Sequence, residues 1–373
     1  MMILCSILIL AGLVSGWVMF WRVPEPGRKK INTSIKEISL TVIIPARNEE
    51  KRISYLLETL QQQKLKVDEI IVVDDGSTDR TRDISMEFGV KVVQNSELNP
   101  GWSGKSLACW NGAKAANGDL LLFMDADTVL SDEKAIGKVI AAYQSEGGTG
   151  ILSLQPYHVV RKSFENISSI FNIIVMTGVN AFTVFKNKFR SAGSFGPFIL
   201  CRRDEYFYAG GHEHIQAAIM DDLALGEAFQ NKQLPVRCFG GKGIVGYSIY
   251  SESLHSLLGG WIKNFATASK STNPFVMTMI NSWIAGGLVN LLFIIWSLIA
   301  VHGSWHNYLL PVILYTVYAV QFYFLARKTG TYNWWVYPIF PLLIIVFTGT
   351  FLTSVYFTKV RKSVTWRGRK IKV

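Results

Sequence analysis

Two aspartates separated by one residue, Asp125 and Asp127, directly follow the apolar run Leu120 to Met124. If that run is a strand, alternation directs both carboxylates to the same side, where they can approach one ion. Carboxylate oxygens suit Mg²⁺ or Mn²⁺, which keep several waters and bridge substrate phosphates. Such an ion neutralises the charge that builds on a leaving diphosphate. Asp125 and Asp127 are therefore candidate metal ligands, although a solvated turn would explain the pair if it stood alone.

A second acidic cluster also follows an apolar run. The carboxylates of Asp74 and Asp75 can accept hydrogen bonds from a nucleobase or a ribose, and Gly76 permits a close backbone approach. The same stretch could instead begin the next helix, with Ser77 or Thr78 as its N-cap. Both interpretations can hold together.

A third cluster, Gly101 to Ser106, contains one lysine in a phosphate-binding context. Lys105 at the start of a helix can contact a diphosphate through its charge and the neighbouring amides. A surface lysine is the alternative. Asn99 stands where a GxxxxGK[ST] loop needs its first glycine, which argues against a nucleoside triphosphatase.

An alternation of strand and helix patterns positions these clusters. Continuous apolar strands separated by helices predict an α/β fold with a doubly wound, mostly parallel sheet. Ligands of such sheets bind beyond the carboxyl ends of the strands, so we expect the polar loops to line one crevice. The expected strands are Leu40 to Pro45, Glu69 to Asp74, Val90 to Gln94 and Leu120 to Asp125, and the expected helices are Glu50 to Gln63, Arg80 to Phe88 and Lys105 to Ala116.

The composition indicates a membrane protein. Apolar residues make up 49% and charged residues 17%, whereas soluble domains carry about 25% charged residues. Met2 to Trp21 has membrane-spanning length and basic residues after it, so we expect an uncleaved anchor whose carboxyl end is cytoplasmic. Much of the net charge of +11 lies beside apolar runs, at 28–30 and 359–372, which fits an anionic membrane surface better than nucleic acid. The cysteines form no CxxC pair and predict free thiols.

Three apolar segments lie near the carboxyl end: Phe275 to Val301, Tyr308 to Ala326 and Trp334 to Phe357. The first two are expected to cross the membrane and return, because Arg327 and Lys328 follow the second. Two prolines in the third favour a re-entrant hairpin, which keeps the basic tail cytoplasmic. The predicted divisions are an anchor at 1–22, a cytoplasmic catalytic domain at 36–270, a transmembrane region at 275–358 and a basic tail at 359–373.

The segment Phe164 to Phe185 is apolar but interrupted by serine and asparagine. It could span the membrane, be buried in the protein, or lie on the membrane surface. We favour an interfacial helix, because the segment falls inside the expected catalytic domain.

The polar loops, in their order along the chain, resemble the family 2 glycosyltransferases with a GT-A fold. The resemblance covers nearly the whole chain and implies a metal-dependent transferase that moves a hexose from a nucleotide-diphosphate sugar. A single displacement at the anomeric carbon implies inversion of configuration. The matching pieces are Thr41 to Glu49, Val73 to Asp79, Gly101 to Lys105, Asp125 to Asp127, Ser194 to Leu200 with Gly210-Gly211, Asp221 to Gly226, and the tail Thr365 to Arg369.

The resemblance also implies roles for single residues. Asp222 occupies the place of the family's catalytic base, and Asp221 stands where the family has glutamate, so either carboxylate could face the acceptor. A favourable charge at a helix N-terminus is the alternative for this pair. Asp125 and Asp127 would hold the metal and the diphosphate. The residues implied for the nucleotide are Pro45, Arg47, Glu49, Asp74 and Asp75, and Lys105 is expected beside the diphosphate from its place at a helix start.

Within the family, Gln155 to His158, Phe164 to Phe185 and Gly210 to His212 look like members that glycosylate carotenoid acids in Gram-positive bacteria. That likeness implies transfer of glucose from UDP-glucose to the carboxylate of a C30 apocarotenoid, giving a glycosyl ester. The apolar anchors are compatible with such a hydrophobic acceptor.

Several alternatives stay open. The acceptor could be another lipid, such as a polyprenyl phosphate, diacylglycerol or a hopanoid. A processive polysaccharide synthase would normally carry a full Gln-x-x-Arg-Trp motif, which is only partly present around Trp261. Trp261 could stack near the acceptor or belong to the core. A non-catalytic membrane scaffold would leave the acidic loops unexplained. Three histidines are expected to be structural rather than metal ligands: His212, His214 and His255.

Overall fold

The computed structural model describes residues 2–27, 38–95, 101–185, 188–216, 218, 220–247, 253–300, 306–361, 363–366 and 369–372. The expected basic cluster at 28–30 lies outside these residues. The chain divides into two compact units. The sheet unit comprises 24–158 and 191–250, and the helical unit comprises 1–23, 159–190 and 251–373. The expected catalytic domain, 36–270, therefore contributes two segments to the helical unit.

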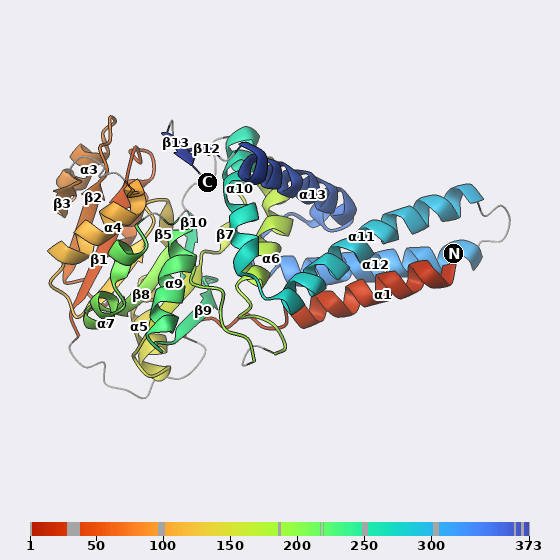
Figure 1. Ribbon diagram of the computed structural model, residues 1–373, viewed down its shortest axis with the longest axis horizontal. Coiled ribbons are helices and arrows are strands. Elements are labelled where there is room, and N and C mark those ends of the chain that lie inside the picture. The colour runs from red at the N-terminus through yellow and green to blue at the C-terminus, as the bar shows by residue number, and fades with distance from the viewer. Residues whose placement is uncertain are drawn as a thin grey trace. The chain divides into compact units, whose positions relative to one another are not determined.

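A seven-stranded sheet forms the centre of the sheet unit, in the order β3-β2-β1-β4-β8-β6-β9 (Figure 1). Only β8 runs antiparallel to its neighbours, so the carboxyl ends of the other strands meet at one edge. The predicted doubly wound, mostly parallel sheet is confirmed. The strands are β1 (Leu40–Ala46), β2 (Glu69–Asp74), β3 (Lys91–Gln94), β4 (Leu120–Met124), β6 (Ile151–Gln155), β8 (Phe198–Arg202) and β9 (Val236–Gly240).

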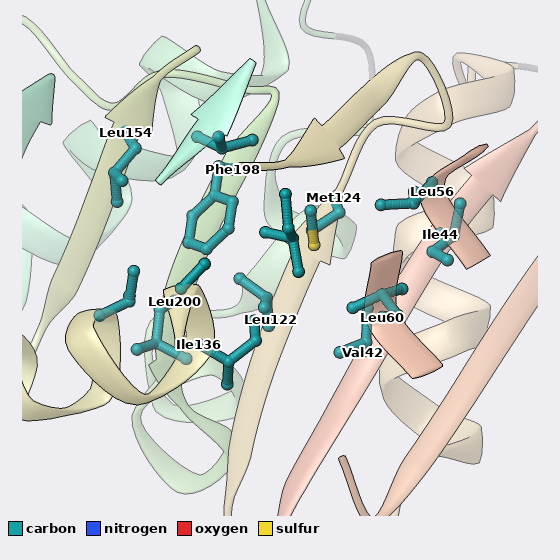
Figure 2. Close-up of a cluster of buried hydrophobic side chains, with 14 of the residues drawn as sticks. Val42, Ile44, Leu56, Leu60, Leu122, Met124, Ile136, Leu154, Phe198 and Leu200 are labelled. Atoms are coloured by element: carbon teal, nitrogen blue, oxygen red, sulfur yellow. The ribbon is translucent and has the colours of Figure 1, made fainter. Parts of the chain in front are cut away.

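The two faces of the sheet are buried in separate apolar clusters, because alternate side chains of each strand point to opposite faces. Val42 and Ile44 belong to one cluster, in which Leu56 and Ile136 cover the strands (Figure 2). Ile43 belongs to the other cluster. Each buried aliphatic side chain contributes about 1.5–3 kcal/mol relative to exposure. Burial on both faces explains why these strands are continuous apolar runs.

Helices and a small second sheet complete the sheet unit. Helices α2 (Ile53–Gln61) and α5 (Ala135–Ser145) supply residues to the first cluster, and α4 (Gly104–Ala115), α7 (Arg203–Tyr208) and α9 (Asp221–Asn231) supply residues to the second. Helix α3 (Thr81–Glu87) follows β2, and the short helix α8 (Gly211–His214) follows α7. Strands β5 (Thr128–Leu130) and β10 (Val245–Tyr247) pair antiparallel.

Three long apolar helices of the helical unit run side by side: α1 (Met2–Met19), α11 (Pro274–Ala300) and α12 (His306–Ala326) (Figure 1). A Cβ on Gly12 of α1 would lie 3.0 Å from the Cα of Gly286 in α11, so glycine permits this close approach. Gln321 of α12 donates to the Leu13 carbonyl at 2.6 Å and accepts from Trp283 at 3.1 Å. Polar bonds therefore join helices whose outer faces are apolar.

The expectation of a re-entrant hairpin near the carboxyl end is wrong. A short 3₁₀ turn (Trp334–Val336) precedes one continuous helix, α13 (Phe340–Tyr356). Pro341 occupies the first turn of α13, where a missing N–H leaves no helical bond unmade. Pro338 lies before the helix, so neither proline interrupts it. Four helices in the described part of the chain are long and apolar enough to cross a membrane, with limits Met2–Met19, Pro274–Ile299, Tyr308–Ala326 and Phe340–Lys359.

The segment predicted as an interfacial helix forms α6 (Ser168–Gly178) within the helical unit. Ile170, Phe171, Asn172 and Ile173 are all buried, so side chains around a whole helical turn pack against protein. The structure thus supports the buried-helix alternative over an interfacial helix. Trp261 of α10 (Leu254–Ala268) stacks on Phe171 at 5.1 Å between ring centroids, which fits its alternative role as a core residue.

The chain ends in a hairpin of β12 (Ser363–Trp366) and β13 (Arg369–Lys372). The side chains of 360–373 lie outside the described residues, so the contact of the basic tail with lipid headgroups stays a prediction.

Candidate active site

The polar clusters identified in the sequence lie at the carboxyl edge of the sheet. Strands β1, β2 and β4 are parallel neighbours that end at Ala46, Asp74 and Met124. Each loop therefore leaves the sheet at the same edge. Strand β8 begins there as well, because Phe198 pairs with Met124.

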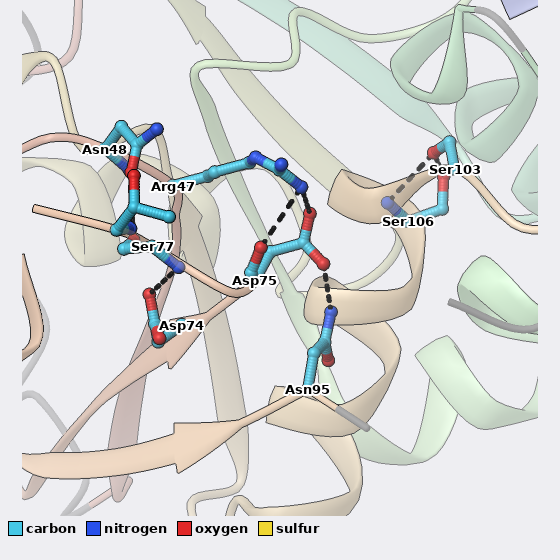
Figure 3. Close-up of polar contacts among 9 residues, drawn as sticks. Arg47, Asn48, Asp74, Asp75, Ser77, Asn95, Ser103 and Ser106 are labelled. Carbon is cyan, nitrogen blue, oxygen red and sulfur yellow. Dashed lines mark hydrogen bonds and ion pairs between the residues drawn. The ribbon is translucent and has the colours of Figure 1, made fainter. Parts of the chain in front are cut away.

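Asp75 is held between the ends of three strands. Arg47, after β1, approaches the Asp75 carboxylate at 3.5 Å and donates to its carbonyl at 3.3 Å. Asn95, after β3, donates to Asp75 Oδ1 at 3.0 Å (Figure 3). These bonds fix the carboxylate position that the sequence predicts for nucleotide recognition.

Asp74 and Glu49 are buried and shape their own loops. Asp74 Oδ1 accepts from the Ser77 backbone N–H at 3.1 Å (Figure 3). Glu49 accepts from Arg52 at 3.0 Å, and its backbone N–H donates to Thr81 Oγ1 at 2.7 Å. Their predicted contact with a nucleotide stays a proposal.

The alternative interpretation of this cluster, a helix cap at Ser77 or Thr78, is not what the structure shows. Helix α3 begins at Thr81, and the Thr81 backbone N–H donates to Asp79 Oδ1 at 3.0 Å. Ser77 instead accepts from the Asn48 backbone N–H at 3.0 Å, and the Thr78 backbone N–H donates to the Asn48 side chain at 2.9 Å. Bonds between the two loops outcompete the local cap.

Lys105 and Asp125 form an ion pair at 2.6 Å, with 30% and 27% of their side chains exposed. Lys105 lies in the first turn of α4, and the preceding Ser103 accepts from the Ser106 backbone N–H at 3.1 Å (Figure 3). Burial alone lowers the pKa of Lys105, but the carboxylates of Asp125 and Asp221 outweigh it and hold that pKa well above its usual value. Lys105 therefore stays charged at the place where a diphosphate is expected.

The electrostatics of Asp125 and Asp127 fit a divalent cation. Burial, followed by the charges of Asp125 and Glu49, raises the pKa of Asp127 from 3.8 to about 7. Burial also raises the pKa of Asp125 despite its partner Lys105. Among the described residues no group of three His, Cys, Asp or Glu side chains could hold a metal. Mg²⁺ needs only one or two protein carboxylates when substrate phosphates supply further oxygens, so the pair fits this ion.

The metal-free protein should lose stability as pH rises from about 4 to about 7, because the folded state keeps a proton on Asp127 that the unfolded state has released. One such group changes the free energy of unfolding by at most about 1.4 kcal/mol per pH unit. Thermal melting in detergent with chelator, at pH 5 and pH 7, measures the difference. Asp127→Asn should make it smaller, whereas an identical pH dependence in both proteins would contradict this assignment.

Asp222, at the start of α9, is anchored to the loop before β8. Its two carboxylate oxygens accept from the backbone N–H groups of Gly196 at 3.0 Å and Leu223 at 2.9 Å. A Cβ on Gly196 would lie 3.2 Å from this carboxylate, so glycine allows the approach. Burial and the Asp221 charge raise the pKa of Asp222 to about 6. Asp222 is thus positioned by the main chain, while Asp221 acts electrostatically on Lys105.

One pocket brings several of the predicted residues together. The lining of this pocket does not include Arg47, Glu49, Asp74, Asp75 or Asp127. Asp127 lies near enough for the charges of Asp125 and Lys105 to shift its pKa. The lining includes Pro45, Lys105, Cys109, Asp125, Gly196, His212, Asp221 and Asp222.

His212 is the pocket residue that the sequence interpretation treated as structural. It is 3% exposed and hydrogen-bonded to Tyr206, as a structural histidine would be, yet it also lines the pocket. The sequence signal was its place after Gly210 and Gly211, whose φ angles are +87° and +50°. His214 and His255 are exposed.

Comparisons with known proteins identify the family and the fold of this chain. Residues 41–206 match the family model described as glycosyl transferase family 2. The curated 4,4'-diaponeurosporenoate glycosyltransferase of Staphylococcus aureus is 34% identical over 369 residues, which cover 99% of this chain and 97% of the relative. Mannosyltransferase PcManGT from Pyrobaculum calidifontis, solved in complex with GDP-Man and Mn²⁺, matches with a TM-score of 0.56 at 15% identity, covering 97% of this chain and 98% of the other. This likeness confirms the expected GT-A fold.

Proposed function

Because the chain belongs to the family 2 glycosyltransferases, we propose that it transfers glucose from UDP-glucose to the carboxylate of a C30 apocarotenoid. The product would be a glycosyl ester of 4,4'-diaponeurosporenoate. The acceptor comes from the name of the relative that is 34% identical over 99% of the chain. The structural observation that carries the proposal is the pocket in which Lys105 and Asp125 meet Asp221 and Asp222.

The proposed reaction is one displacement at the anomeric carbon of glucose. A carboxylate oxygen of the acceptor forms the new bond to this carbon while the bond to the β-phosphate oxygen of UDP breaks. The electron pair of the broken bond leaves with UDP, and the configuration inverts. Lys105 is charged at the diphosphate position and so stabilises the leaving group. Asp125 and Asp127 would hold Mg²⁺ or Mn²⁺, whose chemistry is to neutralise diphosphate charge.

The acid–base demands of this reaction are small. A carboxylic acid with an ordinary pKa near 4 is already ionised at neutral pH and needs no base to become a nucleophile. Asp222, which the Gly196 backbone N–H holds in place, is therefore not needed to remove a proton from this acceptor. Asp221, on the same pocket, limits how closely an anionic acceptor approaches.

The apolar helices support a location in a membrane. We propose a multi-pass protein of the cell membrane whose catalytic part faces the cytoplasm, where UDP-glucose is made. Lys328, after α12, donates to the carbonyls of Phe20 at 2.7 Å and Trp21 at 2.8 Å, after α1. Both helix ends are predicted to be cytoplasmic by the charge rule, and their direct contact supports that orientation.

Mass spectrometry of lipids from cells that express the chain tests the proposal. Cells that also make the C30 carotenoid acid should accumulate its hexosyl ester, and cells with the Asp127→Asn variant should not. Purified membranes with labelled UDP-glucose should form the same product. A labelled polyprenyl phosphate, diacylglycerol or hopanoid with no ester would assign a different acceptor. A ladder of long products would instead indicate a processive synthase.

A further inference from the structure

His212 lines the pocket, and its contacts with Tyr206 define which ring nitrogen carries the hydrogen. Tyr206 Oη accepts from the His212 backbone N–H at 3.0 Å and lies 2.8 Å from the ring atom Nδ1. Within the described part of the chain, these are the polar partners of the buried Tyr206 hydroxyl. Its hydrogen must therefore go to Nδ1, because otherwise it would be buried without an acceptor. A neutral ring that accepts at Nδ1 carries its own hydrogen on Nε2.

The ring is held rigidly and stays neutral. Phe123 and Tyr206 pack against it, with ring centroids 5.4 Å and 5.8 Å away. A Cβ on Gly211 would lie 2.6 Å from the Tyr206 ring, so the turn before His212 has room only for glycine. Burial lowers the pKa of His212 to about 4. The charge of Asp221 opposes this shift, and the charge of Lys105 adds to it. The side chain is thus a fixed, uncharged donor at physiological pH.

The position of the His212 N–H favours a hydrogen bond to the acceptor substrate rather than to the nucleotide sugar. The diphosphate position already has a cation in Lys105, which contacts Asp125. The pocket wall also carries Asp221 and Asp222, which repel an anionic acceptor. A neutral N–H on this wall supplies an attraction for a carboxylate without forming a strong ion pair with Asp221.

We propose that His212 binds the acceptor, its Nε2–H donating to the carboxylate oxygen that does not attack the sugar. The other oxygen is then free to form the glycosidic bond. The same hydrogen bond persists to the carbonyl oxygen of the ester product. This inference rests on the proposed function, since it requires a carboxylic acid as acceptor.

The test compares three variants in membranes with separate titrations of acceptor and UDP-glucose. His212→Phe keeps an aromatic ring but removes the donor, and it should raise the KM for the carotenoid acid about 10- to 100-fold. The KM for UDP-glucose should change less than about twofold. His212→Gln places an amide N–H near Nε2 and should restore most of the acceptor affinity. His214→Phe, the exposed neighbour, is the matched control and should behave as wild type.

Other outcomes overturn the inference. An unchanged acceptor KM in His212→Phe would remove the proposed hydrogen bond, and a selective loss of UDP-glucose affinity would place it on the diphosphate. If His212→Phe loses affinity for both substrates equally, melts at a lower temperature and is not rescued by His212→Gln, the histidine is purely structural. If wild type forms no ester with the acid but glycosylates a neutral lipid, the proposed function fails and this inference with it. If wild type is active on the acid and His212→Phe has the same KM for it, only this inference fails.

Discussion

Replacing Asp127 with asparagine should lower sugar transfer by roughly three orders of magnitude while the protein still folds and inserts in the membrane. Asparagine has nearly the same shape but brings no negative charge to a cation. Burial and the charges of Asp125 and Glu49 raise the pKa of Asp127 to about 7, because the nearby Arg52 and Lys105 do not fully offset them in the metal-free site. Transfer of labelled glucose in isolated membranes measures the activity, and electron paramagnetic resonance of Mn²⁺ measures binding directly.

The control for this variant is Asp83→Asn, an exposed aspartate in the first turn of α3. It should bind Mn²⁺ and turn over as wild type does. Asp127→Asn should also melt no lower than wild type at pH 7 in chelator, because it removes a carboxylate that is costly to ionise there. Lost activity with undiminished stability excludes misfolding. Full turnover in chelator and in Asp127→Asn would refute the metal role.

Replacing Lys105 with methionine should lower kcat/KM for UDP-glucose by about 10²–10³-fold. Methionine has a similar length but no charge, so the leaving diphosphate loses a positive partner. The change also leaves Asp125 without the ammonium group that lies 2.6 Å away. We expect weaker UDP binding as well, since the charge acts on both the bound donor and the product. Titration with UDP-glucose and competition by UDP measure the two effects.

Lys114→Met is the matched control, because Lys114 lies in the last turn of the same helix, where its ammonium is 5.8 Å from the Trp110 ring. Its activity should stay within about twofold of wild type. If the two lysine variants lose activity equally, the effect would come from the helix and not from charge at the diphosphate. A Lys105→Met enzyme with normal UDP affinity would leave Lys105 as a partner of Asp125 only.

The sequence by itself determined the order of strands and helices at the beginning of the sheet unit. Apolar runs such as Leu120 to Met124 are local signals, and burial on both faces of a sheet produces them directly. Because parallel strands end at one edge, the same local pattern placed Asp75, Lys105 and Asp125 in neighbouring loops. Residue types then indicated phosphate and metal chemistry.

Local pattern misjudged several segments. Pro338 and Pro341 suggested a hairpin, but Pro338 lies before α13 and Pro341 lies in its first turn, where proline is compatible with a helix. The place of Phe164 to Phe185 inside the expected catalytic domain favoured a helix on the membrane surface, whereas α6 is buried in the helical unit. A periodic pattern of polar and apolar residues shows that one face of a helix is covered, but it does not show whether protein or lipid covers that face.

Only the tertiary structure decided which distant side chains meet. Strand β8 inserts antiparallel beside β4, and this brings Gly196 against Asp222, 26 residues later in the chain. The same packing turns His212, held by Tyr206, toward the pocket that contains Lys105. Such contacts depend on how layers of the fold pack, and the free energy of packing is shared among many residues, so no short stretch of sequence encodes it.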